Sequence, residues 1–157
     1  HLLLKLRNYT QPEKVNKKNI LLASLLDELI PLLKPDLLNN QIQFKNSVDP
    51  NFRVSVDKEK FSQVFLNLIQ NSIQAKDSTK VSSFIEIITL NQTIIIRDNG
   101  LGIDETILSR IFNPFYTTKK KGSGIGLSIV QNIIASHGGT IEVESEVGKG
   151  TSFKINI

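Results

Sequence analysis

The 157-residue sequence contains no cysteine, methionine or tryptophan. Without cysteine, the chain forms neither disulfide bonds nor cysteine-ligated zinc sites, which is typical of a reducing compartment. No apolar run reaches the roughly 18 residues of a membrane-spanning helix. We therefore expect a cytoplasmic domain. Because the chain begins at His1 without a Met or a charged-then-apolar leader, we interpret it as part of a longer protein, and a membrane anchor in that parent stays open.

A large excess of one charge is absent as well. The chain has 19 Lys and Arg residues against 15 Asp and Glu residues, a formal charge of +4. Much of this excess lies in the run Lys119, Lys120 and Lys121. The distribution favours a local anion site over a broad basic surface, so we expect no nucleic-acid partner.

The length is sufficient for one domain with its own core. Residues 1–12 hold a leucine cluster that ends at a Tyr-Thr-Gln-Pro breaker, so we interpret them as the tail of a helix that leaves another domain. Residues 13–157 form the predicted domain.

Helical and strand patterns alternate along this domain. Leucines at helical spacing predict a helix over 20–40, which Pro31 and Pro35 should kink or segment. Asp57 is a candidate N-cap for a second helix. The other expected elements are short strands at 41–48 and 52–56 joined by a turn, a hairpin of 84–90 with 93–98, a short helix after Asp104, a helix over 127–136, and two strands around a turn at 148–150. This order predicts an α/β fold with a layer of helices on a mixed sheet.

The helix that follows Asp57 has an unusual polar stripe made almost entirely of amide side chains. Its members are Lys60, Gln63, Asn67, Gln70, Asn71 and Gln74. A stripe of this kind can simply face water. However, solvated helix faces normally carry charged residues, and asparagine is a poor helix former. Asn67 and Asn71 are four residues apart, so both can reach one ligand, and an amide oxygen suits Mg²⁺.

The segment Asp98-Asn99-Gly100 follows an apolar strand. Such a tripeptide is often a hairpin turn, but a hairpin requires a second strand directly afterwards, and here an N-cap and a helix follow. Gly100 and Gly102 are therefore expected to let the backbone approach a ligand closely. A carboxylate at Asp98 in an apolar pocket needs a donor, and a nucleobase amine is one.

The glycine-rich segment precedes a helix. Gly122, Gly124 and Gly126 have the spacing G-x-G-x-G after a lysine run, which matches neither the dinucleotide fingerprint nor the phosphate loop of common NTPases. A flexible connection with solvated lysines is one interpretation. The other is a phosphate site, because helix N-termini carry free N–H groups and a positive dipole end.

Five segments together resemble one family: FLNLIQNSIQA, DNGLGI, IFNPFYTTK, GSGIGLSIV and GKGTSFKI. In this order they are similar to the conserved boxes of the ATP-binding catalytic domain of sensor histidine kinases, which share a superfamily with the gyrase, heat-shock chaperone and MutL ATPases. The resemblance covers about residues 15–157. It implies a two-layer α/β sandwich of the Bergerat type, with helices on one face of a mixed, mainly antiparallel sheet.

The resemblance also implies roles for individual residues. Asn71 would bind Mg²⁺, Asp98 the exocyclic amine of adenine, and Lys119 the terminal phosphate. Phe112 and Phe115 would anchor a lid at about 112–125. Asn67 and Lys119 are the implied catalytic residues. The full set implied to bind ATP is Asn67, Asn71, Ala75, Asp98, Gly100, Gly102, Ile103, Thr117, Thr118, Lys119, Gly122, Ser123, Gly124, Ile125, Gly126, Leu127 and Thr151, with Thr151 in the water network around the aspartate.

Gln74 departs from part of the family. Some members have a basic residue three places after the magnesium asparagine, so here the cationic group must come from the lid or from Lys76. In the related ATPases, a glutamate that activates water commonly occupies the position of Asn67, and an amide cannot accept a proton. The resemblance therefore favours a kinase over an ATPase. A serine-directed kinase and a degenerate signalling domain that no longer catalyses transfer remain alternatives.

The expected partners follow from the same resemblance. They are an upstream helical hairpin that carries the acceptor histidine, and the receiver domain of a response regulator. The full-length protein would be a homodimer and this fragment a monomer. His1 does not match the acceptor pattern. His137 precedes two glycines at a helix end, where a cation is favourable, and we interpret it as structural. The fragment should therefore bind ATP and Mg²⁺ without phosphorylating itself.

Overall fold

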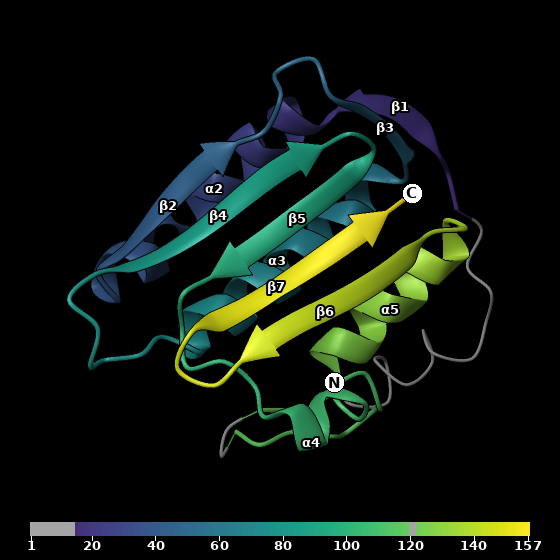
Figure 1. The fold of residues 1–157 in the computed structure, drawn as a ribbon. Helices are drawn as coiled ribbons and strands as arrows, with labels where there is room; N and C mark the ends of the chain where they lie inside the picture. The colour runs from purple at the N-terminus through teal and green to yellow at the C-terminus, as the bar shows by residue number, and fades with distance from the viewer. Residues whose placement is uncertain (1–14, 120–121) are drawn as a thin grey trace.

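The computed structural model describes residues 15–119 and 122–157, and its main feature is a mixed sheet in the strand order β2-β4-β5-β7-β6 (Figure 1). These strands are β2 (Ile42–Ser47), β4 (Ser83–Leu90), β5 (Thr93–Asp98), β7 (Gly150–Asn156) and β6 (Thr140–Glu146). Only the β2–β4 pair is parallel; the other pairs are antiparallel.

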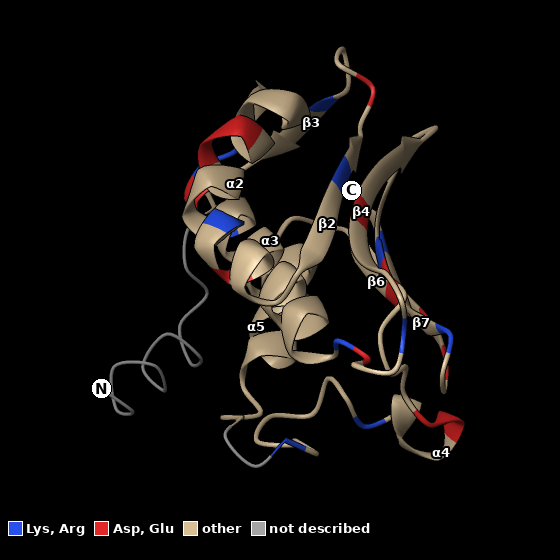
Figure 2. Ribbon diagram, turned by 90° about the vertical axis from the view of Figure 1, so that its left-hand side faces the viewer, with Lys and Arg blue, Asp and Glu red and all other residues tan. Residues whose placement is uncertain are grey.

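Three helices cover one face of this sheet, as the side view shows (Figure 2). They are α2 (Leu22–Asn39), α3 (Lys58–Gln74) and α5 (Gly126–Ser136). A fourth, α4 (Glu105–Leu108), lies beyond the end of the sheet (Figure 1). The predicted two-layer α/β sandwich is therefore confirmed.

Helix α3 is the central helix of the layer and starts at Asp57, as predicted. The Asp57 side chain accepts a hydrogen bond from the N–H of Lys60, 3.2 Å away. Burial alone would raise the pKa of Asp57, but hydrogen bonds from the N–H groups of Asn16 and Lys60 outweigh it and lower the pKa. The carboxylate is thus stabilised in the form that caps a helix.

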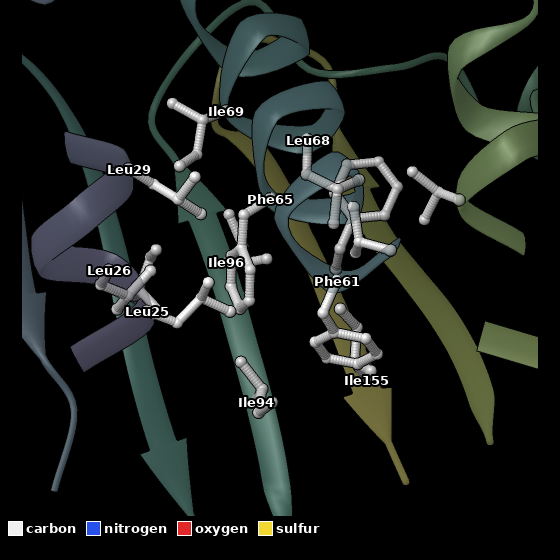
Figure 3. Packing of buried hydrophobic residues seen from close by; sticks show 14 of the residues in the cluster. Leu25, Leu26, Leu29, Phe61, Phe65, Leu68, Ile69, Ile94, Ile96 and Ile155 are labelled. Carbon is white, nitrogen blue, oxygen red and sulfur yellow. The ribbon is translucent and has the colours of Figure 1, made fainter. Parts of the chain in front are cut away.

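The hydrophobic core lies between the helices and the sheet. Phe61 and Phe65 of α3 are fully buried and meet edge to face, with ring centroids 6.1 Å apart. They lie between leucines of α2 and isoleucines of the sheet (Figure 3). Other labelled members of this core are Leu25, Leu26, Leu29, Leu68, Ile69, Ile94, Ile96 and Ile155. This packing fixes the position of α3 relative to β5.

The prediction that prolines would segment the first helix is wrong. Helix α2 is continuous and contains both Pro31 and Pro35. Both prolines lie on the exposed face, whereas the buried positions are leucines. The lost backbone hydrogen bonds therefore fall on the solvent side, where carbonyl groups can turn to water.

The two strands after α2 exist as predicted, but they belong to different sheets. β2 joins the main sheet, whereas β3 (Arg53–Val56) pairs with β1 (Lys18–Leu21) in a separate two-stranded sheet. The pattern analysis missed β1 because Ile20 and Leu21 continue directly into the leucine-rich helix. Local periodicity does not reveal which strand pairs with which.

The remaining predicted elements are present. β4 and β5 form the expected hairpin, and β6 and β7 form the last one. Asp104 caps α4 by accepting a hydrogen bond from the N–H of Thr106. The predicted tail at 1–12 lies outside the described residues. Among the described helices, none has the length and apolar character of a membrane span.

Candidate active site

A cavity of about 560 Å³ opens where α3 and β5 end and α5 begins. This volume is in the range of small-molecule sites. The predicted site residues that line it are Asn67, Asn71, Ala75, Asp98, Gly102, Ile103, Thr117, Thr118, Lys119, Gly122, Ser123, Gly124, Gly126, Leu127 and Thr151. Gly100 and Ile125 do not line it. The fold thus brings together segments that are far apart in the sequence.

Asp98 ends β5 at the wall of the cavity. Its Oδ2 atom accepts a hydrogen bond from Ser72 Oγ at 2.7 Å, and Oδ1 accepts from the N–H of Gly100 at 2.8 Å and of Thr151 at 3.3 Å. Burial raises the pKa of Asp98, while these donors and the charge of Lys80 oppose the rise. The carboxylate is therefore a partly desolvated acceptor aimed at a ligand.

Thr151 connects Asp98 to a small hydroxyl network. Thr151 is buried, and its Oγ1 atom lies 2.8 Å from Ser145 Oγ, which also donates to the Gly150 carbonyl oxygen. This network keeps the β7 backbone in place beside the aspartate. The predicted water network around Thr151 stays a prediction.

Gly100 has a different role from the one expected. A Cβ atom there would lie 2.3 Å from the carbonyl oxygen of Ala75, so the glycine allows close approach of two backbone segments and not of a ligand. The adjacent N–H of Leu101 donates to the same Ala75 oxygen at 2.7 Å. Gly102 has φ +74° and a Cβ there would lie 2.0 Å from the Glu146 carbonyl. Both glycines hold the base of the cavity together.

The amide stripe of α3 faces the cavity along its second half. Asn67, Gln70, Asn71 and Gln74 all line the cavity, whereas Gln63 does not. The interpretation that the stripe faces water therefore fails for these four residues. Four neutral amides can contact an anion and its metal ion without the repulsion that carboxylates would cause.

Lys119 contacts two of these amides. Its Nζ atom donates to Gln74 Oε1 at 2.9 Å and to Asn71 Oδ1 at 3.3 Å. Burial lowers the pKa of Lys119, and the charge of Asp98 counteracts this. Among the described lining residues this lysine, and not Lys76, is the cation of the cavity. The ammonium shows that the Asn71 oxygen is accessible to a positive charge, and a neutral oxygen donor fits Mg²⁺.

The described residues of 111–125 close the cavity on its outer side. Phe112 packs edge to face on Phe153, with centroids 6.4 Å apart, as an anchor should. Phe115 does not: its side chain is 58% exposed, so its predicted anchoring role is wrong. The backbone of Phe115 has φ +65°, and its N–H donates to the Gly124 carbonyl oxygen at 2.9 Å. The contact that closes this segment is therefore made by the main chain.

Helix α5 begins at the cavity without a side-chain cap. Its N-cap is Ile125, whose side chain is buried in place of lining the cavity. Gly126 and Leu127 line the cavity, and a Cβ on Gly126 would lie 3.2 Å from Asn67 Oδ1. The N–H groups of the first turn of a helix have no intrahelical partner, which suits a phosphate.

Several cavity residues escaped the sequence analysis. They are Ser72, Leu101, Ile107, Ile111, Tyr116 and Phe153. Ser72 had a signal, because it is a polar residue on the apolar face of α3 and its buried hydroxyl required a partner. The apolar residues had none, because an apolar residue that lines a cavity has the same pattern as a core residue.

His137 lies away from the cavity and is structural, as expected. It is 3% exposed, Nε2 accepts a hydrogen bond from the N–H of Asp57 at 3.0 Å, and Nδ1 lies 2.7 Å from the Ile133 carbonyl oxygen. A nitrogen that accepts a hydrogen bond carries no proton. The imidazole therefore fits here as a neutral group, and the expected cation at this helix end is wrong.

Comparison with known proteins defines the class. Residues 56–157 match the family described as Histidine kinase-, DNA gyrase B-, and HSP90-like ATPase, and the chain belongs to this family. The resemblance inferred from the sequence is thereby confirmed.

Particular relatives are histidine kinases. Sporulation kinase A of Bacillus subtilis is 37% identical over 142 residues, which are 89% of this chain and 23% of that protein. Sensor histidine kinase ZraS of Escherichia coli K12 is 35% identical over 140 residues, 85% of this chain and 29% of the relative. The chain thus spans about a quarter of the length of these relatives.

Solved structures agree on the fold. The nucleotide-free catalytic domain of histidine kinase ThkA has a TM-score of 0.77 and 30% identity, and the match covers 90% of this chain and 95% of that domain. ThkA in complex with the response regulator protein TrrA has a TM-score of 0.78 and 27% identity, over 99% of this chain and 46% of that one.

Proposed function

We propose that this chain is the ATP-binding catalytic domain of a two-component sensor histidine kinase. It would transfer the terminal phosphoryl group of ATP to a histidine on an upstream helical hairpin of the same protein. The observation that carries this proposal is the distribution of acidic groups. Among the described residues that line the cavity, Asp98 is the only Asp or Glu, and it lies at the end of β5, away from the start of α5.

Asp98 would recognise the base. Its ionised oxygens accept hydrogen bonds only, so they select a ligand that presents an amine, such as adenine, and reject one that presents a carbonyl, such as guanine. Ser72 and the N–H of Thr151 hold the carboxylate in place. Apolar residues such as Ile103 and Ile107 would contact the faces of the base.

The phosphates would lie toward the start of α5. The free N–H groups of its first turn and the ammonium of Lys119 supply positive charge there. Asn71 would hold Mg²⁺ through its Oδ1 atom. The ion, when bound, neutralises phosphate charge.

Asn67 decides between transfer and hydrolysis in this proposal. It lies at the predicted phosphate end, and an amide cannot take a proton from water. Water is therefore poorly activated. A histidine ring nitrogen needs no such base: it attacks the terminal phosphorus, the bond to the bridging oxygen breaks, and ADP leaves.

The partners follow from the relatives. The acceptor hairpin would precede this chain in the parent protein, which would be a homodimer, while the fragment alone would be a monomer. A receiver domain would take the phosphoryl group from the histidine, because ThkA, 27% identical, forms a complex with a response regulator. Cytoplasmic location of the domain is part of the same proposal.

The test supplies the acceptor separately. The chain would be mixed with the hairpin of its parent protein and ATP labelled on the terminal phosphate. We expect an acid-labile, base-stable label on the hairpin and little free phosphate. Phosphate release that outpaces labelling would favour an ATPase, an acid-stable label a serine-directed kinase, and the absence of ATP binding a degenerate domain.

A further inference from the structure

A lysine outside the cavity supports the loop that follows Asp98. Lys80 belongs to the connection between α3 and β4 and is not among the cavity residues. Its Nζ atom donates to the carbonyl oxygen of Asn99 at 2.5 Å and to that of Gly100 at 3.4 Å. An ammonium has three donors and can hold both oxygens at once.

Further contacts join the same two segments. The Asn99 side chain donates from Nδ2 to the Ser82 carbonyl oxygen and accepts the N–H of Phe84 on Oδ1, both at 2.8 Å. The loop after β5 is therefore fixed against the loop before β4 from several directions, and Lys80 provides the charged donor among these contacts.

The geometry of one peptide unit links Lys80 to Asp98. The bond between Asn99 and Gly100 is trans and planar, so its C=O and N–H point in opposite directions. Lys80 holds the oxygen of this unit, and its N–H donates to Asp98 Oδ1 at 2.8 Å. Rotation of the unit would break both hydrogen bonds together.

Lys80 also places a positive charge near the aspartate. Its charge lowers the pKa of Asp98 and opposes the effect of burial. Lys119, from the segment that closes the cavity, is a second charged group that interacts with Asp98. Ser72 and Thr151 contribute neutral donors.

We propose that Lys80 is a positioning residue of the adenine site. It aims the Gly100 N–H at Asp98 through the shared peptide unit and supplies the positive charge behind this carboxylate. The inference rests on the proposed role of Asp98 in base recognition. Lys80 itself contacts no ligand.

The turn before Lys80 directs the lysine. Asp77 is buried, and its Oδ1 atom accepts hydrogen bonds from Thr79 Oγ1 at 2.6 Å and from the N–H of Thr79 at 2.9 Å. The N–H of Lys80 donates to the Asp77 carbonyl oxygen at 3.3 Å. This turn gives Lys80 a defined starting point from which to reach the Asn99 carbonyl.

The experiment compares Lys80→Met with Lys80→Arg. ATP affinity would be measured by calorimetry from acidic to alkaline pH. We expect Lys80→Met to bind ATP about tenfold more weakly at neutral pH, the effect of one lost hydrogen bond from a charged group. Its affinity should also begin to fall at a higher pH on acidification, because Asp98 protonates earlier without the nearby charge. Lys80→Arg should restore most of both properties.

Two controls separate the possible causes. Lys18→Met removes an equal charge from an exposed position of β1 and should behave like the wild type. Unchanged affinity and pH profile in Lys80→Met, with weak binding by Asp98→Asn, would overturn the role of Lys80 alone. Weaker binding without a shifted profile would also overturn it, because general loss of structure has that effect. Wild-type binding by Asp98→Asn would overturn the adenine assignment itself.

A variant that fails to fold leaves the test decisive. If Lys80→Met does not fold, the folded Lys80→Arg protein is compared with the wild type. An unchanged pH profile in Lys80→Arg supports the proposal, and a profile displaced upward overturns it.

Discussion

The ammonium of Lys119 donates a hydrogen bond to Oδ1 of Asn71, with 3.3 Å between the two atoms. The lysine belongs to the proposed lid, and the asparagine is the proposed magnesium ligand on α3. An ammonium and Mg²⁺ cannot contact the same oxygen at the same time. Movement of the lid lysine and binding of the metal ion are therefore coupled.

Gln74→Ala should loosen the proposed lid. The change removes the shorter of the two hydrogen bonds of Lys119, the one at 2.9 Å. We expect the backbone amides of 115–119 to exchange hydrogen about fivefold faster without nucleotide, the effect of about 1 kcal/mol on an opening equilibrium. Mass spectrometry would measure this, with Gln92→Ala in the exposed β4–β5 turn as the control. Equal exchange in both variants would show that the contact does not hold the lid.

Asn71→Ala should remove the dependence of ATP binding on Mg²⁺. In the wild type we expect Mg²⁺ to strengthen binding by about tenfold or more, and in the variant this gain should disappear. The melting temperature should stay the same or rise slightly, because alanine is the better helix former. Calorimetry with Mg²⁺ and with chelator measures the effect, and Gln63→Ala on the part of the stripe outside the cavity is the matched control. A variant that retains the full gain would remove Asn71 from the metal site.

Asp98→Asn should exchange selectivity for stability. ATP should bind about tenfold to hundredfold more weakly, and discrimination against GTP should relax, since an amide both donates and accepts. Equal loss for both nucleotides would point to misfolding instead.

The pH dependence of that variant has a defined sign. Burial raises the pKa of Asp98 in the folded protein, so ionisation of this group destabilises the fold as the pH rises from the pKa of an unfolded aspartate through the raised value. The amide side chain of the variant cannot ionise. The variant should therefore melt at a higher temperature than the wild type at neutral pH, and the difference should vanish as the pH falls below the pKa of an unfolded aspartate. Thermal melts across acidic pH test this. A difference that grew on acidification would contradict the assigned direction.

Gly124→Ala should weaken ATP binding more than it weakens the fold. Gly124 has φ +67°, and a Cβ there would lie 2.5 Å from the carbonyl carbon of Phe115. The closing segment must therefore shift, yet it contributes little to the core. The matched control is Gly138→Ala, with φ +79° and nothing within 4 Å of a Cβ. It should cost about 1 kcal/mol of stability through its backbone conformation alone and leave ATP affinity unchanged. A large drop in the melting temperature of Gly124→Ala would make this glycine structural.

His137→Ala should destabilise the domain by about 2 kcal/mol or more. The change leaves the N–H of Asp57 without its imidazole partner and opens space beside Phe61, whose ring centroid lies 5.3 Å from that of His137. Urea denaturation would measure the loss. ATP affinity of the folded variant should remain normal, because the residue lies outside the cavity. A phosphoryl group found on His137 during turnover would refute its structural role.

The sequence alone was sufficient where the physical signal is local. Asp57 as a cap, the buried face of α3 and the hairpin of β4 and β5 all follow from spacing within one element. The motif order also identified the family and most residues of the cavity. It could not identify Ile107 and Ile111 as cavity residues, because burial in a core and exposure to a cavity produce the same apolar pattern.

Only the tertiary structure decided features that depend on contacts between distant segments. The pairing of β3 with β1, the contact of Lys119 with Gln74 and the hydrogen bond from Lys80 to the Asn99 carbonyl each join residues from separate elements. The exposure of Phe115 is a further case, since its backbone and not its ring closes the segment. Local propensity determined which helices and strands form, whereas packing of the helix layer on the sheet determined which side chains meet, because those distances are set by the whole core.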